Sequence, residues 1–176
     1  MKIVRLLQLF FFLSIIIISS CSENDEELVD TSLISFEEAT FSENEFIIYL
    51  TEDPNEKTFS FGAGTYNFTN TIPLADIENL TIKGAGIDET YFDFSNSTST
   101  TGEGIAAVDC SNLLFCGFTI QNTNGGNAIT ARNITGLRID GVGTVWPEIS
   151  PENGAYGIYP VAVSYTHLTL PTNREV

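Results

Sequence analysis

One short pattern recurs three times in this chain and limits the folds it can adopt. The pattern is a short strand closed by Gly, and it occupies residues 79–84 (NLTIKG), 112–117 (NLLFCG) and 136–141 (GLRIDG). The starts lie 33 and then 24 residues apart. A strand unit that recurs at such intervals cannot bury its apolar side alone and needs neighbours stacked on it. The sequence therefore predicts an all-β fold, a coiled β-solenoid.

The alternation within these units predicts which side chains face the core, because successive residues of a strand point to opposite sides. Six residues are expected to stack in the core: Leu80, Ile82, Leu113, Phe115, Leu137 and Ile139. Six others are expected on the opposite side: Thr81, Lys83, Leu114, Cys116, Arg138 and Asp140. The mixed character of this second set suits contact with solvent.

Further short strands are expected to complete the turns of the coil, at 58–61, 65–68, 91–94, 104–108, 118–121 and 128–130. Gly, Pro and Asn separate several of these segments, which is typical of strand boundaries. The interval of 33 residues corresponds to one turn plus an insertion. We expect the insertion at 95–102, because this stretch is rich in Ser and Thr.

A short helix is expected at 42–50, before the first strands. Ser42 and Glu45 have the spacing of a capping box. The apolar residues that follow, Phe46, Ile47, Tyr49 and Leu50, fall on one helical stripe. A solenoid needs its first rung covered, since an exposed parallel edge promotes aggregation. The helix is therefore the candidate N-terminal cap of a solenoid domain spanning 42–162.

The N-terminal residues 1–20 have the features of a secretory signal peptide. Lys2 and Arg5 precede an apolar run at 6–18 that is too short for a comfortable membrane span. The run ends in Ser19, Ser20 and Cys21, which resembles the lipobox of bacterial lipoproteins, where the Cys is lipidated. Lipidation of Cys21 would anchor the chain to a membrane without spanning it. The alternative is an ordinary signal peptide with an incidental Cys.

The segment 21–41 is expected to be an acidic tether, because its run 22–27 (SENDEE) has nothing to bury. Acidic residues directly after a lipidated Cys resemble the surface-export signal of lipoproteins in one group of gram-negative bacteria. The alternative is a spacer that faces the periplasm. Both place the protein in the bacterial cell envelope, anchored by lipid to the outer membrane.

The last residues, 163–176, do not resemble the rest of the chain. They are similar to a tail of translated adapter sequence found on unrelated fragments from environmental sequencing, and we expect them to be non-native. His167, the single His of the chain, lies in this tail. No His-based catalysis or metal site is therefore predicted for the rest of the chain.

The charge of the chain is strongly negative and excludes some partners. Without 1–20 and 163–176, four basic and 22 acidic residues remain, so the net charge of this part is about −18. Such a charge disfavours nucleic acid and anionic lipid headgroups.

Cys110 and Cys116 are expected to be free thiols, with a disulfide as the alternative that strand geometry disfavours.

Three segments resemble the hallmarks of the bacterial parallel β-helix repeat-containing proteins, relatives in fold of the pectate lyases. They are 61–66 (FGAGTY), 80–86 (LTIKGAG) and 153–161 (NGAYGIYPV), and the resemblance covers 42–161. It implies a right-handed coil of three-stranded rungs, with more rungs following Val161, so that the domain here is incomplete at its C-terminus. Members of this family are exported, often as lipoproteins. Related folds cleave, epimerise or bind acidic polysaccharides.

Few residues are candidates for a site. Arg132, Arg138 and Asp140, together with Asp109, are the plausible polar set on adjacent rungs, and an Arg can hold a uronate carboxylate in bidentate fashion. The alternative is a set of surface charges that pair weakly. Trp146 and Tyr156 flank a Pro-containing loop and are candidates for stacking against a sugar ring. The alternative is that these two rings seal the rung beneath the loop.

No metal site is predicted, although the acidic residues keep Ca²⁺ as an alternative cofactor. A polar strip of Asn122, Asn124, Asn127 and Asn133 is better explained by left-handed turns and stacked Asn side chains than by ligand binding.

These observations predict an exported lipoprotein that binds or processes polysaccharide outside the cytoplasm, through a right-handed parallel β-helix. Whether it is an enzyme stays open; a lyase, an epimerase and a glycoside hydrolase are the classes considered. The alternative is a non-catalytic module that is adhesive or part of an envelope assembly. We also expect self-association through the uncovered last edge of the solenoid.

Overall fold

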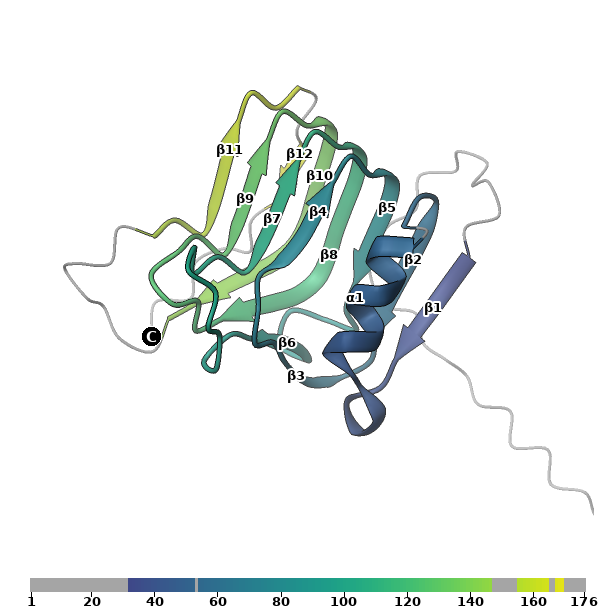
Figure 1. Cartoon of the computed structure of the whole chain (residues 1–176), viewed down its shortest axis with the longest axis vertical. Helices are drawn as coiled ribbons and strands as arrows, with labels where there is room; N and C mark the ends of the chain where they lie inside the picture. The colour runs from purple at the N-terminus through teal and green to yellow at the C-terminus, as the bar shows by residue number, and fades with distance from the viewer. Residues whose placement is uncertain (1–31, 53, 147–154, 165–166, 170–176) are drawn as a thin grey trace, which may run out of the picture.

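The computed structural model describes residues 32–52, 54–146, 155–164 and 167–169, and these residues form the parallel β-solenoid that the repeats predict (Figure 1). The coil makes about five turns. All strand pairs within the described ranges are parallel.

Two sheets wrap around one core. Sheet A runs in the order β1 (Ser32–Phe36), β2 (Lys57–Phe61), β5 (Glu78–Lys83), β8 (Ser111–Gln121), β10 (Thr135–Val145) and β12 (His167–Thr169). Two short strands of the same sheet, β3 (Gly64–Asn67) and β6 (Thr90–Asp93), pair with each other, and β6 also pairs with β8. Sheet B consists of β4 (Ile72–Ala75), β7 (Ile105–Val108), β9 (Ile129–Arg132) and β11 (Ile158–Val161).

Two long strands, β8 and β10, each serve two faces of the coil. The first part of β8 pairs with β5 and its last residues pair with β6, with Gly117 (φ 68°) between the two parts. Gly141 (φ 58°) lies opposite it in β10. Gly adopts this left-handed conformation at low cost. The prediction that Gly closes the strand is correct for β5, but at these two positions the strand bends and continues, so 118–121 is not a separate strand.

The predicted core is confirmed. All six inward residues of the repeated units are 0 or 1 % exposed. On the outward side Cys116 is wrongly predicted, because it is fully buried. It lies next to the bend at Gly117 and in register between Lys83 and Asp140, so larger neighbours flank its small side chain.

Aromatic rings fill the core at the capped end of the solenoid. We call this group the aromatic nest; its members are Phe36, Phe41, Phe46, Phe59, Phe61, Tyr66, Phe68 and Phe92. Seven of the eight side chains are buried, and Phe41 is partly buried. Most of the ring pairs meet edge to face, which is a favourable arrangement for aromatic side chains.

The N-terminal cap is confirmed as α1 (Glu43–Glu52), slightly later than the predicted 42–50. The Ser42 hydroxyl accepts a hydrogen bond from the Glu45 amide at 3.4 Å, which is one half of the predicted capping box. Phe46 and Leu50 face the core. The Glu43 carboxylate accepts hydrogen bonds from the Thr69 and Asn70 amides, both at 3.0 Å, and so ties the helix to the turn before β4.

The solenoid begins earlier than predicted. The expected tether 21–41 contains β1 and a 3-10 helix (Glu38–Thr40), and β1 pairs along its whole length with β2. Phe36 provides the reason, because this residue is 7 % exposed within the aromatic nest. At the other end, Val163 packs against the core, and β12 lies in register with β10. Residues of the expected tail 163–176 therefore occupy positions on the coil.

The insertion was only partly located from the sequence. The connection from β5 to β6 is five residues longer than the corresponding stretch within β8 of the next turn. The connection from β6 to β7 is four residues longer than the corresponding connection from β8 to β9. The predicted insertion at 95–102 accounts for the second step. The first lies in the segment after β5, where the Ile87 carbonyl accepts a hydrogen bond from the Thr119 hydroxyl at 2.6 Å.

The turns from sheet B to sheet A stack on one another. Left-handed residues recur in two columns, Asp76, Asp109, Asn133 and Ala162 in one and Asn79, Asn112 and Gly136 in the other. The Asn112 amide donates a hydrogen bond to the Asn79 side chain at 2.9 Å. Of the four Asn residues of the predicted polar strip, Asn122 and Asn133 are left-handed, with φ 60° and 54°, as the structural explanation predicts. Cys110 and Cys116 are not joined in a disulfide, as expected.

Candidate functional site

The outward side of sheet B carries apolar residues on β4, β7 and β11, whereas β9 between them contributes the buried Thr130 and the exposed Arg132. Alternate residues of β4 and β7 face the core, which leaves the residues between them outside. Two outward rows lie in register across the four strands, with Pro73, Ala106, Thr130 and Tyr159 in the first and Ala75, Val108, Arg132 and Val161 in the second. We call these eight residues the sheet B face. Single exposed apolar residues are ordinary, whereas a continuous set marks an interaction surface.

A pair of exposed aromatic rings stands at one end of the sheet B face. Tyr156 and Tyr159 are 60 % and 39 % exposed. Their ring centroids are 5.4 Å apart and the ring planes differ by 19°. In such a stack each ring covers one side of the other, so the opposite sides remain available to a ligand.

A hydrogen-bonded network fixes the chain beside this pair. The Tyr156 amide donates to the Asn127 side chain at 2.8 Å. The Asn127 amide group donates in turn to the Thr130 hydroxyl at 3.1 Å, and that hydroxyl donates to the Glu103 carboxylate. Thr130 is only 2 % exposed. Because this network and the pairing of β11 with β9 hold the backbone, the two rings are presented on a rigid support.

Arg132 ends β9 on the same face. It is exposed, and it lies in register with Val161 and two residues beyond Thr130, which pairs with Tyr159. Among the described residues its guanidinium has no hydrogen bond or ion pair. Arg132 and Tyr156, two of the residues proposed from the sequence, lie at opposite ends of the β9–β11 pair, because the Tyr156 amide donates to Asn127, which precedes β9, whereas Arg132 is the last residue of β9.

Arg138 and Asp140 lie elsewhere, on the outward side of sheet A. Their side chains meet at 3.2 Å. The pKa of Asp140 is below its ordinary value because the Thr169 hydroxyl donates to it, which outweighs the effect of burial, and Arg138 adds to the lowering. The polar set expected on adjacent rungs is thus divided between two sheets, and Asp109 lies in the turn that separates them.

Trp146 follows β10 and packs against the core as a partly buried residue. Its indole N–H donates to the Thr123 hydroxyl at 2.9 Å. These contacts agree with the sealing role that the sequence left open. The loop 147–153, between Trp146 and Tyr156, lies outside the described residues.

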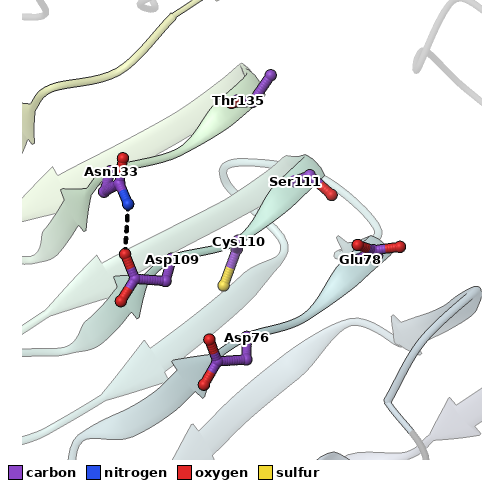
Figure 2. A pocket seen from close by; sticks show the side chains of 7 residues that line it. All are labelled: Asp76, Glu78, Asp109, Cys110, Ser111, Asn133 and Thr135. Atoms are coloured by element: carbon purple, nitrogen blue, oxygen red, sulfur yellow. Dashed lines mark hydrogen bonds between the residues drawn. The ribbon is translucent and has the colours of Figure 1, made fainter.

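The acidic turns form a second candidate, a pocket of about 310 Å³ (Figure 2). Its lining consists of Asp76, Glu78, Asp109, Cys110, Ser111, Asn133 and Thr135. Asn133 donates a hydrogen bond to Asp109, and burial raises the pKa of the Cys110 thiol. Within the described ranges no group of three or more His, Cys, Asp or Glu residues is placed to hold a metal ion. The turn geometry explains these residues without a ligand.

Tyr159 is the residue that sequence reasoning missed. The signal was present, because the alternation of β11 places Tyr159 opposite in orientation to the inward Ile158. Its significance depends on the register, which sets it beside Tyr156 and close to Arg132.

In the part of the chain that the structure describes, no helix is long and apolar enough to cross a membrane.

Comparison of the chain with protein families, with curated proteins and with solved structures gives no match.

Proposed function

We propose that this protein binds polysaccharide on the sheet B face. The observation that carries the proposal is the stacked, exposed pair of Tyr156 and Tyr159, the second held in β11 and the first by hydrogen bonds of its backbone to Asn127 and Ala128. Aromatic rings offer a large apolar contact area at a low cost in conformational entropy. A ring of this kind suits the C–H side of a sugar, whose hydroxyl groups then point toward polar neighbours such as Arg132 and Glu103.

Binding is the activity that the geometry supports, because among the described residues a single carboxylate, that of Glu103, is hydrogen-bonded to the strand next to Tyr159. Glu103 is the carboxylate beside the tyrosine pair, and it already accepts the Thr130 hydroxyl. Glycoside hydrolysis ordinarily uses two carboxylates on either side of the scissile bond. We therefore assign the tyrosine pair a role in holding glycan.

The test compares variants that lose a tyrosine ring at the sheet B face with a variant that loses one elsewhere. Tyr156→Ala and Tyr159→Ala are expected to weaken glycan binding by tenfold or more each, measured by affinity electrophoresis in soluble polysaccharides. Tyr49→Ala is the matched control, because Tyr49 is 36 % exposed but lies on α1. Equal binding by all three variants and the parent protein would reject the sheet B face as the site. Assay of the same mixtures for new chain ends would reveal processing.

We also propose that the protein is exported and anchored by lipid at Cys21, in the envelope of a bacterium. The support is the sequence of 1–21, which lies outside the described residues. Metabolic labelling with a radioactive fatty acid should label the parent chain and leave Cys21→Ala unlabelled. Accessibility of intact cells to an antibody would then distinguish display on the surface from a periplasmic location.

The second candidate function is a non-catalytic module that adheres to another envelope component. The apolar character of the sheet B face favours it, since Pro73, Ala75 and Val108 extend the contact area away from the tyrosine pair. This second function would be supported over the first if the protein bound no glycan and if Tyr156→Ala still retained a protein partner.

A further inference from the structure

We infer that the sheet B face selects neutral glycans over chains that carry uronate groups. This inference rests on the proposed function and specifies its ligand. Two features of the face support it, the distribution of charge around the face and the size of the side chains that form its floor.

The charge around the face opposes an acidic ligand. Arg132 is the single charged residue among the eight positions. Asp76 and Asp109 directly follow the second-row residues Ala75 and Val108, and both side chains line the pocket of Figure 2. Both acidic residues are therefore one position beyond the second row in the chain, and charges so near are only weakly screened at physiological salt, where the screening length is about 8 Å.

A third carboxylate borders the first row. Glu103 accepts a hydrogen bond from the hydroxyl of Thr130, the residue in register with Tyr159. The whole chain carries a net charge of −16, so the long-range field repels an anionic polymer as well. One exposed Arg132 does not offset three neighbouring carboxylates and this net charge, whereas a neutral glycan is indifferent to the field.

The floor of the face suits the apolar side of neutral sugars. Away from the tyrosine pair the outward residues are small or flat, as at Pro73, Ala75 and Ala106. Strands in a sheet are about 4.8 Å apart, so the face spans roughly 14 Å across four strands, and on β9 the buried Thr130, bonded to Glu103, interrupts the first row. A β-linked glycan with equatorial hydroxyls presents its C–H groups above and below the rings. The geometry thus places the glycan across the strands, along the axis of the coil, with Tyr159 at one end.

A conservative substitution can remove two of these carboxylates. Asn133 already occupies the third rung of the column formed by Asp76 and Asp109, and all three residues are left-handed. Asn tolerates that conformation as well as Asp does. The double variant Asp76→Asn and Asp109→Asn therefore removes two charges while keeping the turn. The matched control is Glu37→Gln with Glu89→Gln, which removes two exposed charges from turns next to strands of sheet A, after β1 and before β6.

The experiment measures affinities of the full chain for β-1,4-linked glucose oligosaccharides and for oligogalacturonates of the same length, at low salt. The parent is expected to bind the neutral series at least tenfold more tightly. The Asp76→Asn and Asp109→Asn double variant should raise oligogalacturonate affinity threefold to tenfold and leave neutral affinity within twofold, whereas the control pair should raise it less than twofold.

Two results would overturn the inference. Oligogalacturonate binding equal to or tighter than neutral binding, and lost in Tyr159→Ala, would refute neutral selection while the proposed function stands. An unchanged ratio of the two affinities in the Asp76→Asn and Asp109→Asn variant would refute the role given to these carboxylates. Failure of both oligosaccharide series to bind would instead reject the proposed function itself.

Discussion

Aromatic side chains gather in two regions of this molecule, and the regions differ in burial. In the aromatic nest, rings such as Phe46, Phe59 and Phe61 are 0 or 1 % exposed and contact one another from several sides. At the β11 end of the sheet B face, Tyr156 and Tyr159 contact each other and are 60 % and 39 % exposed. The same chemistry therefore serves stability in the first region and, in our proposal, recognition in the second.

The position of the nest follows from the need for a cap. Phe46 of α1 meets Phe36, Phe59 and Phe61 at centroid distances of 5.3 to 5.5 Å, and so joins the helix to the first rungs. Later rungs fill the core with aliphatic residues such as Leu137 and Ile139. A rung between two like rungs needs no such bridge, because strands of identical spacing stack directly.

The largest expected effect comes from a ring in the nest. Phe92 is fully buried and contacts Phe61, Phe68 and Phe118 at centroid distances of 4.6 to 5.3 Å. We expect Phe92→Ala to lower the free energy of unfolding by about 3–5 kcal/mol, because transfer and cavity costs add. Urea denaturation measures this change in the free energy of unfolding. Tyr156→Ala should lie within about 0.5 kcal/mol of the parent, as exposed substitutions usually do.

The comparison would fail if Phe92→Ala and Tyr156→Ala destabilised the protein to the same extent. Such a result would mean that the exposed tyrosine is part of the packing, and the assignment of the sheet B face to recognition would lose its basis.

The next effect concerns the cap over the nest. Glu43→Ala removes the acceptor of two backbone amides, those of Thr69 and Asn70, and of the Thr69 hydroxyl at 2.7 Å. Because Thr69 and Asn70 are exposed, water replaces part of the interaction, and a loss of about 1–2 kcal/mol is expected. Glu45→Ala is the control in the same helix.

Hydrogen exchange should show faster exchange at the Thr69 and Asn70 amides in Glu43→Ala than in Glu45→Ala. Equal rates in the two variants would show that the cap is held by its apolar side alone. The pair of Tyr156 and Tyr159 should bind glycan equally in both variants.

Inward positions could be predicted from the sequence because strand alternation alone decides them, as for Leu80 and Ile139. The cap was found because Ser42 and Glu45 carry a local signal. Strand β1 was missed, since its five residues lack flanking turn signals and its role appears only when Phe36 joins the nest.

The candidate site was harder to predict than the core. Which face of a three-sided coil a residue occupies depends on where the chain turns, and bends such as the one at Gly117 have no marker that separates them from strand ends. Arg132 and Arg138 are therefore six positions apart in the sequence but lie on different sheets. Tyr159 became a candidate only through its register with Thr130.

A smaller effect on stability is expected at Tyr66, a buried tyrosine that contrasts with the exposed pair. The Tyr66 hydroxyl donates to the Phe36 and Gly62 carbonyls at 3.0 and 3.2 Å. Both carbonyls have another donor, so Tyr66→Phe should cost about 1 kcal/mol. Burial, with the charges of Glu37 and Glu38, raises the pKa of Tyr66 to about 12.

The raised pKa predicts a loss of stability in alkali. An unfolded tyrosine ionises near pH 10, whereas folded Tyr66 keeps its proton to about pH 12. The contribution of Tyr66 is therefore complete below pH 10 and is lost as the pH rises toward 12. Denaturation midpoints at pH 8 and pH 11 should fall less in Tyr66→Phe than in the parent. An identical fall in both would contradict the assignment.

The smallest effect is expected for the same substitution on the sheet B face. Tyr156→Phe and Tyr159→Phe keep the rings and remove hydroxyl groups that have no hydrogen-bond partner within the described residues. Stability should change by less than about 0.5 kcal/mol. Glycan affinity should stay within threefold of the parent, because the ring supplies the contact, and affinity electrophoresis can resolve this from the tenfold loss expected for Ala. A Phe variant that binds as weakly as the Ala variant would show that the phenolic hydroxyl, and not the ring, holds the sugar.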